Sequence, residues 1–422
     1  MKLVRNRKLS KSFFGVLVTL ICVASVCFTS CVQHGKPGKY DPSEVNFQPS
    51  YIDVLDNIVY PSLILGLGHY GGDDQTSLFS VQVTSPERGA VLRIVIDSSL
   101  LNYVTILQET MPDKGETYTF YPKLKWKYDK LYALRQQGSV DLTFTCFIND
   151  EEVDVKTLFL NYRSVNESIL SVRSNGKNYD LRWLFAAYVN EDHPYIDQIL
   201  SSLLQEGVVA RFSGYQPGKV TVKDQVFAIW YYALSHGISY SSISCTSNPS
   251  NNANVQHIRF FDEVYNTRQA NCIDACVFFA SILRKIGLKP VIFVEPCHAF
   301  LGYYTDKNRK NISLLETTIT SWVNFPELDR SLTPDGTLPA ESFDKVKRFL
   351  SETQLKQYEE GKMDFKDLKM NVARSLFEKA SVYNSDEYNA NKTHFADSTN
   401  LSFQQLDIEQ LRKLVQPIAN TL

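Results

Sequence analysis

Residues 271–318 read NCIDACVFFASILRKIGLKPVIFVEPCHAFLGYYTDKNRKNISLLETT and decide how the second half of the chain folds. Apolar residues recur at three- and four-residue steps after Cys272, which predicts a buried helix. Asn271 is a favoured N-cap, and Gly287 stands where a helix ends. Residues 291–294 are β-branched or aromatic and predict a strand, and further apolar runs begin at residues 299 and 312. The segment therefore predicts a helix followed by consecutive strands.

This segment also carries the three kinds of group that make a thiol site. A thiol at a helix N-terminus, as predicted for Cys272, lies where the peptide dipoles favour the thiolate. A nearby imidazole can hold and return the proton, and a carboxylate can orient that imidazole. The chain supplies these groups in the order Cys272, His298 and Glu316, and we expect them to converge in space.

Four short motifs connect this segment to a known family. They are CIDA at 272–275, FASILRKIG at 279–287, HAF at 298–300 and LETT at 315–318. Through them residues 225–320 resemble the transglutaminase-like superfamily of enzymes with a papain-like core. The resemblance implies an α+β domain in which Cys272 is the nucleophile, His298 the base and Glu316 the orienting acid, with no cofactor.

The sequence departs from the pattern of this family at three positions. Glu316 stands where Asp is usual, Asn271 where a small or acidic residue is common, and Cys297 where Gly is common. Glu for Asp is a mild chemical change, whereas Cys297 places a second thiol beside the histidine. The family includes hydrolases, cross-linking enzymes and inactive relatives, so the resemblance does not fix the reaction.

Residues 1–30 have the pattern of an export leader. Five basic residues precede an apolar run over 13–26, which is too short for a comfortable transmembrane helix. The run ends in Phe28-Thr29-Ser30-Cys31, which resembles a bacterial lipobox and predicts lipidation of Cys31. An ordinary secretory signal or an uncleaved anchor is the alternative interpretation.

Two folded domains are expected after the leader. Residues 31–50 lack periodicity and predict a tether, and short strand patterns over 51–163 predict an all-β, immunoglobulin-like sandwich. The region 123–136 is an amphipathic helix or an edge segment, whose Trp126 and Tyr128 either cover the sandwich edge or contact a carbohydrate. Residues 175–422 are expected to form the transglutaminase-like domain and a helical extension.

Helices are predicted before and after the cysteine helix. They cover residues 181–188, 195–204 and 220–236, with more over 343–380, and a last strand or helix over 402–418. Trp230 is expected in the core or as one wall of a substrate cleft. The region 185–260 also resembles exported bacterial proteins that pair a β domain with a transglutaminase-like one.

Three more residues near the site have open roles. Gln256 is a candidate second donor to an oxyanion, beside the backbone N–H of Cys272, with a structural hydrogen bond as the alternative. His257 is a second imidazole, but the motif favours His298 as the base. Asp274 lies in the first turn of the predicted helix, where a carboxylate stabilises the helix dipole.

Charge and cysteine content limit the classes of function. The formal charge of −2 becomes more negative once the basic leader is removed, which gives no indication of a nucleic-acid partner. Outside the leader and Cys31, five cysteines remain, and because this number is odd at least one thiol is free. A zinc site from Cys272, Cys276, Cys297 and His298 is an alternative, although adjacent strand residues point to opposite faces.

The sequence therefore predicts a lipid-anchored enzyme of the bacterial cell envelope. Its expected partners are a peptide or protein substrate, whose amide bond the thiol attacks, and the membrane, through Cys31. Hydrolysis and transfer to an amine both remain open. The alternative is an inactive transglutaminase-like protein that serves for binding or as a scaffold.

Overall fold

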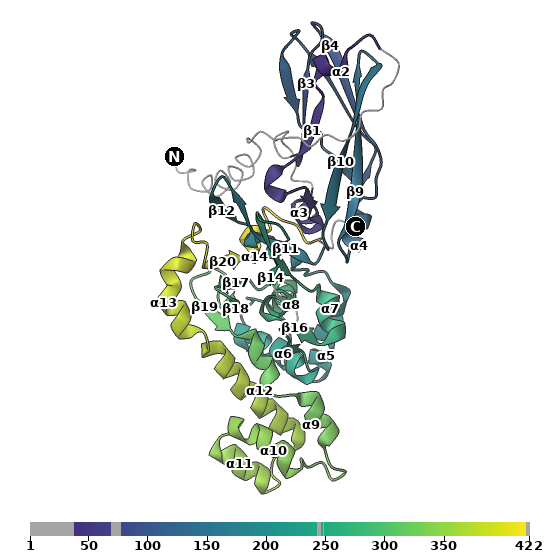
Figure 1. The fold of residues 1–422 in the computed structure, drawn as a ribbon. Helices are drawn as coiled ribbons and strands as arrows, with labels where there is room; N and C mark the ends of the chain where they lie inside the picture. Colours follow the sequence, from purple (N-terminus) through teal and green to yellow (C-terminus); the bar gives the residue numbers. More distant parts are fainter. Residues whose placement is uncertain (1–37, 69–76, 243–245, 248, 419–422) are drawn as a thin grey trace. The chain divides into compact units, whose positions relative to one another are not determined.

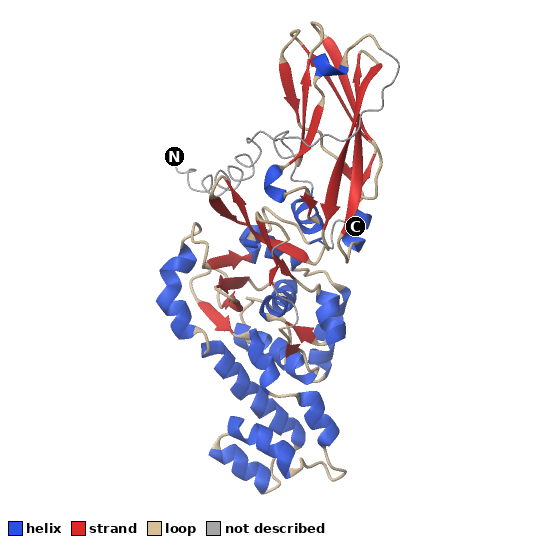
Figure 2. Ribbon diagram, in the orientation of Figure 1, coloured by secondary structure: helices blue, strands red, loops and turns tan. Residues whose placement is uncertain are grey.

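The computed structural model describes residues 38–68, 77–242, 246–247 and 249–418 (Figure 1). The fold is mixed α+β with several sheets (Figure 2). The described residues form two compact units: the first contains those up to 184, those within 246–256 and residue 418, and the second contains the rest. Within the described ranges, no helix has the length and apolarity needed to cross a membrane. The predicted leader, Cys31 and the start of the predicted tether lie outside these ranges.

Two sheets build the core of the first unit. One has the order β1 (Gln48–Tyr51), β3 (Phe79–Thr84), β7 (Thr117–Phe120). The other has the order β2 (Ile58–Val59), β10 (Glu151–Tyr162), β9 (Gly138–Ile148), β4 (Ala90–Ile96), β6 (Thr105–Met111). Alternate residues of β3, β4 and β9 are buried, as expected for strands with one face on a core. Phe79 and Phe144 pack with ring centroids 6.1 Å apart, so the sheets share that core.

The tether predicted over residues 31–50 is wrong in its second half. Residues 42–51 form the short helix α2 (Pro42–Val45) and strand β1, which pairs with β3. Val45 and Phe47 are buried in this segment, and their burial outweighs the polar composition that suggested a tether. The first unit therefore begins earlier than predicted.

The region 123–136 contains both predicted kinds of structure. Strand β8 (Lys125–Trp126) pairs with β5 (Asn102–Tyr103), and helix α4 (Tyr128–Ala133) follows. Trp126 is half-buried and its ring lies 6.2 Å from that of Phe79. This packing favours the structural role of Trp126 over a carbohydrate contact.

A small third sheet completes the first unit. Its order is β12 (Lys177–Asp180), β11 (Glu167–Ser174), β15 (Ala253–His257), β14 (Thr246–Ser247). Helices α3 (Pro61–Leu67) and η1 (Asp53–Leu55) pack on β11. Strands β12, β14 and β15 lie beyond residue 175, so the first unit includes segments that were expected in the second domain.

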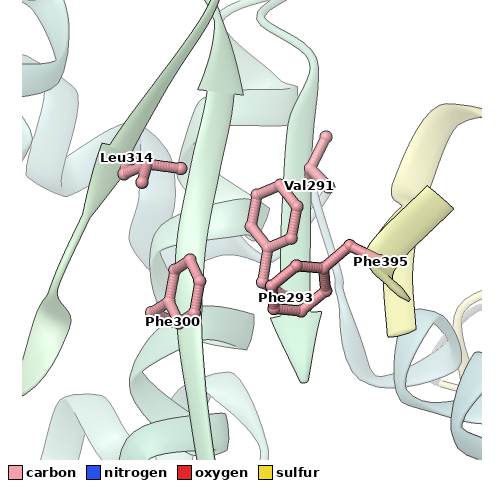
Figure 3. Packing of buried hydrophobic residues seen from close by; sticks show 5 residues of the cluster. All are labelled: Val291, Phe293, Phe300, Leu314 and Phe395. Atoms are coloured by element: carbon pink, nitrogen blue, oxygen red, sulfur yellow. The ribbon is translucent and has the colours of Figure 1, made fainter. Parts of the chain in front are cut away.

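The second unit is built around helix α8 (Cys272–Lys285) and an antiparallel sheet. The sheet has the order β19 (Ile312–Leu315), β18 (His298–Tyr304), β17 (Pro290–Glu295), β20 (Gln404–Asp407). Helix α8 packs on β17 and β18, and it begins and ends as the sequence predicts, with Gly287 at a φ of 79° after its C-cap. On the sheet, Phe293 packs against Phe300 and Phe395, with centroids 5.1 and 5.2 Å away (Figure 3).

Most of the remaining second unit is helical. Before the cysteine helix come η4 (Arg182–Tyr188), α5 (Pro194–Gln205), α6 (Val222–Ser235) and α7 (Phe261–Thr267), and strand β13 (Ser239–Tyr240) pairs with β16 (Gln269–Ala270). After the sheet come η5 (Thr317–Trp322), α9 (Phe325–Ser331), α10 (Ala340–Val346), η6 (Lys347–Phe349), α11 (Glu352–Glu359), α12 (Phe365–Val382), α13 (Ser385–Ala396) and α14 (Ile408–Leu411). Trp230 of α6 is fully buried against Phe279 and Phe377, which assigns it to the core.

Candidate active site

Cys272 is the first residue of helix α8. The side chain of Asn271 accepts a hydrogen bond from the backbone N–H of Asp274 at 2.8 Å, and the Asp274 carboxylate accepts one from the Asn271 N–H at 3.0 Å. This reciprocal capping fixes the start of the helix. The Cys272 thiol is free and half-buried, and it stands where the helix dipole favours a negative charge.

Asp274 does more than cap the helix. Its fully buried carboxylate accepts hydrogen bonds from the backbone N–H of Arg259 at 2.8 Å and from its guanidinium at 2.7 Å. Burial raises the pKa of Asp274, although the hydrogen bonds of Asn271 and Arg259 act in the opposite direction. The pair therefore ties the segment before α7 to the turn that carries Cys272.

His298 is the first residue of β18 and links the thiol to the acid. Its Nε2 lies 2.7 Å from Oε2 of Glu316, and the side chain of Cys272 is close enough to the ring to raise its pKa. Burial alone lowers the pKa of His298, but the hydrogen bonds and charges of Cys272 and Glu316 outweigh this effect and raise it to about 10. The imidazolium is thus the stable form of the ring at neutral pH.

Glu316 is a buried carboxylate with a full set of donors. Its Oε1 accepts hydrogen bonds from the N–H and the hydroxyl of Thr318, at 2.9 and 2.6 Å. Burial raises its pKa, but the hydrogen bond and charge of His298 and the bonds from its other donors outweigh burial, so its pKa lies below the usual value. Glu316 therefore stays ionised beside the ring.

Asn384 is a member of this group that sequence reasoning missed. Its side-chain amide donates to Oε2 of Glu316 at 2.7 Å, from the N-cap position of α13 and 68 residues further along the chain. The backbone N–H of Glu316 also donates to the carbonyl of Ala380 on α12, at 2.9 Å. No local pattern around Asn384 distinguishes it from the other asparagines of the chain, so only the tertiary fold identifies it.

The structure explains the cysteine before the histidine. Strands β17 and β18 pair Glu295 with His298, so Pro296 and Cys297 form a two-residue turn. Cys297 has a φ of 63°, a left-handed conformation that Gly adopts without cost. This turn position thus holds an exposed cysteine in a conformation that favours Gly.

The other thiols of the proposed zinc site do not share this environment. Cys276 is fully buried one turn along α8; its Sγ lies 4.0 Å from the Thr317 hydroxyl, and burial raises its pKa well above the usual range. Among the residues that the structure describes, no group of three or more His, Cys, Asp or Glu side chains is placed to hold a metal ion. The four described cysteines are all free, and Cys245 lies outside the described residues.

Gln256 and His257, which were predicted near the site, belong to strand β15. Gln256 of β15 pairs with Thr246 of β14. Gln256 falls in the first unit, whereas Cys272 falls in the second. His257 is the last residue of β15. The structure thus brings Cys272, His298 and Glu316 together in the second unit, whereas Gln256 belongs to the first.

Comparison with known proteins does not identify the chain. No protein-family model matches the sequence, and no curated protein is similar to it.

Proposed function

We propose that the second unit is a papain-like, transglutaminase-type enzyme whose thiol attacks amide bonds of peptides or proteins. The observation that carries the proposal is the placement of the His298 ring, which hydrogen-bonds Glu316 and lies close enough to Cys272 for that side chain to raise its pKa. A thiol, an imidazole and an ionised carboxylate in this order are the groups that nucleophilic catalysis of acyl transfer requires. The cysteine helix packed on a sheet whose strand β18 begins at His298 supports the papain-like assignment.

The reaction follows from the charges of these groups. The Cys272 thiolate attacks the amide carbonyl carbon, and the backbone N–H at the start of α8 is a donor for the oxyanion that forms. The C–N bond then breaks, and the His298 imidazolium gives its proton to the leaving amine, which leaves a thioester and a neutral ring. Because the Nε2 atom of His298 is hydrogen-bonded to Glu316, we assign the transferred proton to Nδ1.

The second half of the reaction restores the site. Water or an amine attacks the thioester carbon, and the neutral ring of His298 takes the proton of the attacking group. The C–S bond then breaks and the thiolate returns. Water yields a hydrolase and an amine yields a cross-linking enzyme, and Gln256 remains the sequence-based candidate for a second oxyanion donor.

Selective alkylation tests this proposal. The chain is treated with limiting iodoacetamide at pH 6, and the modified cysteines are quantified by peptide mass spectrometry. We expect Cys272 to react faster than the exposed Cys297, because only Cys272 has an imidazolium partner. Cys276 and Cys146 are buried and serve as internal controls. If Cys297 reacts first, the inactive binding or scaffold protein becomes the better interpretation.

Substrate assays then separate the two reactions. The chain is incubated with a glutamine-containing protein and a fluorescent primary amine, and incorporation of the amine and release of new peptide termini are measured in parallel. Incorporation indicates a transferase, and new termini indicate a hydrolase. Both signals should vanish in Cys272→Ala; activity that persists in this variant contradicts the assigned nucleophile.

We further propose that the first unit is an immunoglobulin-like sandwich and that the protein is anchored to a bacterial membrane through Cys31. Two sheets of mostly antiparallel strands that share the Phe79–Phe144 contact support the first statement, and the lipobox-like sequence at residues 28–31 supports the second. Labelling of growing cells with a radioactive fatty acid checks the anchor. Cys31→Ala should lose the label, and a chain that keeps it is not lipidated at this residue.

A further inference from the structure

A hollow on the second unit, outside the triad, has the features of a ligand site. It has a volume of about 380 Å³ and is lined by Trp322, Arg348, Phe349 and Lys379. These residues come from three elements that pack together, namely η5, η6 and α12. Small-molecule pockets span roughly 300–1,000 Å³, so this volume suits a small ligand or one end of a longer one.

Both cations of the hollow lack a carboxylate partner among the described residues. Neighbouring lysines do have one: Lys345 lies 2.8 Å from Glu327, and Lys369 lies 2.6 Å from Asp329. Within the described ranges, no ion pair reaches Arg348 or Lys379, and the guanidinium of Arg348 lies over the ring of Phe349, 4.8 Å from its centroid. Two positive charges are thus available to one occupant.

The aromatic residues give the hollow an apolar side. Trp322 is 42% exposed, although tryptophan is usually well buried, and its ring packs edge-on against that of Tyr383 at 6.1 Å. Phe349 is buried and lines the hollow beside Arg348. A partly exposed tryptophan held by a second ring offers a rigid face to a bound group.

We propose that this hollow binds a carboxylate carried next to an aromatic or other apolar group, as at the C-terminal residue of a peptide with an apolar side chain. The planar guanidinium of Arg348 matches a carboxylate with two parallel hydrogen bonds, and Lys379 adds a point charge. Trp322 and Phe349 contact the apolar group. The proposal does not depend on the reactivity of Cys272.

The hollow lies on the same elements that hold Glu316. Helix η5 begins after Glu316 and ends at Trp322, a span of roughly 12 Å at the rise of a 3₁₀-helix. Lys379 directly precedes Ala380, whose carbonyl accepts the backbone N–H of Glu316. An occupant therefore binds to the framework of the triad without touching its reacting groups.

Titration calorimetry with three small probes tests the site. The full chain carrying Cys272→Ala is titrated at low salt with N-acetylphenylalanine, N-acetylphenylalaninamide and N-acetylglycine. We expect N-acetylphenylalanine to bind at least tenfold more tightly than either of the others, because the amide lacks the charge and the glycine derivative lacks the ring. Equal affinity for the acid and its amide, or no binding of the acid, overturns the proposal.

Variants of the two cations complete the test. Arg348→Gln and Lys379→Gln should each weaken binding of N-acetylphenylalanine at least fivefold, and Arg348→Lys should lie between Arg348→Gln and the parent. Lys392→Gln removes a charge from the exposed face of α13 and is the matched control, which should bind like the parent. Circular dichroism checks that each variant is folded. Folded Arg348→Gln and Lys379→Gln proteins that both bind like the control overturn the proposal.

Discussion

Two β-hairpins, one in each unit, make their turns with different residues. In the first unit, β9 and β10 are joined by Asn149 and Asp150, with φ values of 50° and 66°. Asn and Asp accept this left-handed conformation, and it is the geometry of a mirror-image hairpin turn. In the second unit, β17 and β18 are joined by Pro296 and Cys297, and here a cysteine adopts a φ of 63°.

The difference between the hairpins lies beside the candidate site. Asn149 and Asp150 satisfy the local preference of their turn, whereas Cys297 contradicts it directly before His298. A non-glycine residue in this region costs about 1–2 kcal/mol, and such residues persist where the surrounding structure holds them in place. The second hairpin is therefore held by its tertiary contacts more than by its turn.

The largest effect on stability is expected from substitutions in the hydrophobic cores that contain the strands of the two hairpins. Phe293→Ala should destabilise the second unit by about 3–5 kcal/mol, because the change leaves a cavity between Phe300 and Phe395 (Figure 3). Leu142→Ala, at a fully buried position of β9, should destabilise the first unit by about 2–5 kcal/mol. Hydrogen exchange read by mass spectrometry should locate each loss mainly in its own unit. Equal loss in both units from either change would show that the hairpins do not have separate cores.

The next effect concerns the reactivity of Cys272. His298→Ala should slow its alkylation at pH 6 by at least about tenfold, because the variant lacks the positively charged ring that favours the reactive thiolate. Asn149→Ala changes the other hairpin and should leave the rate unchanged. The rates are measured with iodoacetamide and peptide mass spectrometry. An unchanged rate in His298→Ala would show that the ring does not stabilise the thiolate.

A smaller effect is expected when the acid loses its charge. The carboxylate of Glu316 favours the imidazolium, so Glu316→Gln should lower the pKa of His298 from about 10 by at least about one unit, or 1.4 kcal/mol. As the pH rises, the variant ring then loses its proton earlier than the parent ring. NMR of the ring Cε1 proton measures the titration curve of His298 in the parent and in Glu316→Gln. The His394→Gln variant lacks one of the other histidine signals, which assigns that signal to His394. A ring that titrates near its ordinary value in the parent protein would contradict the raised pKa.

The smallest effect tests the turn itself. Cys297→Gly should stabilise the second unit by about 0.5–1 kcal/mol, because relief of the left-handed cysteine exceeds the extra backbone entropy of glycine in the unfolded chain. Asn149→Gly should instead destabilise the first unit, because the Asn149 side chain accepts a hydrogen bond from the Val91 N–H at 2.9 Å and donates to Tyr40 and Glu87 at 2.9 and 2.6 Å. Urea denaturation compares the two variants with the parent. If Cys297→Gly destabilises the second unit, the Cys297 side chain makes a contact whose stabilising free energy exceeds the cost of the left-handed backbone.

Local signals were sufficient to predict helix α8 but not the whole site. The N-cap Asn271, the apolar spacing after Cys272 and the terminal Gly287 all act within a few residues, so the helix could be predicted and its ends are confirmed. The partners that complete the site act over long distances. Arg259 reaches Asp274, and Asn384 reaches Glu316, through side-chain geometry that only the folded chain defines.

Tertiary burial also overrode local composition elsewhere. Residues 42–50 are polar enough to predict a tether, yet Val45 and Phe47 pack into the first unit. Residues 181–188 were predicted as a helix, and residues 182–188 form the 3₁₀ segment η4, which apolar periodicity does not distinguish from an α-helix over so few residues. The placement of Gln256 in the first unit follows from strand pairing, which the sequence around it does not specify.

The contact between Asn384 and Glu316 has a consequence for protein synthesis. A ribosome completes Cys272, His298 and Glu316 well before it adds the residue whose amide holds the acid. Strand β20, which pairs with β17 beside the site, is translated later still. A nascent chain that stops near residue 360 thus contains the whole triad and Thr318 but neither Asn384 nor β20, so Glu316 gains its last side-chain donor only when translation is almost finished.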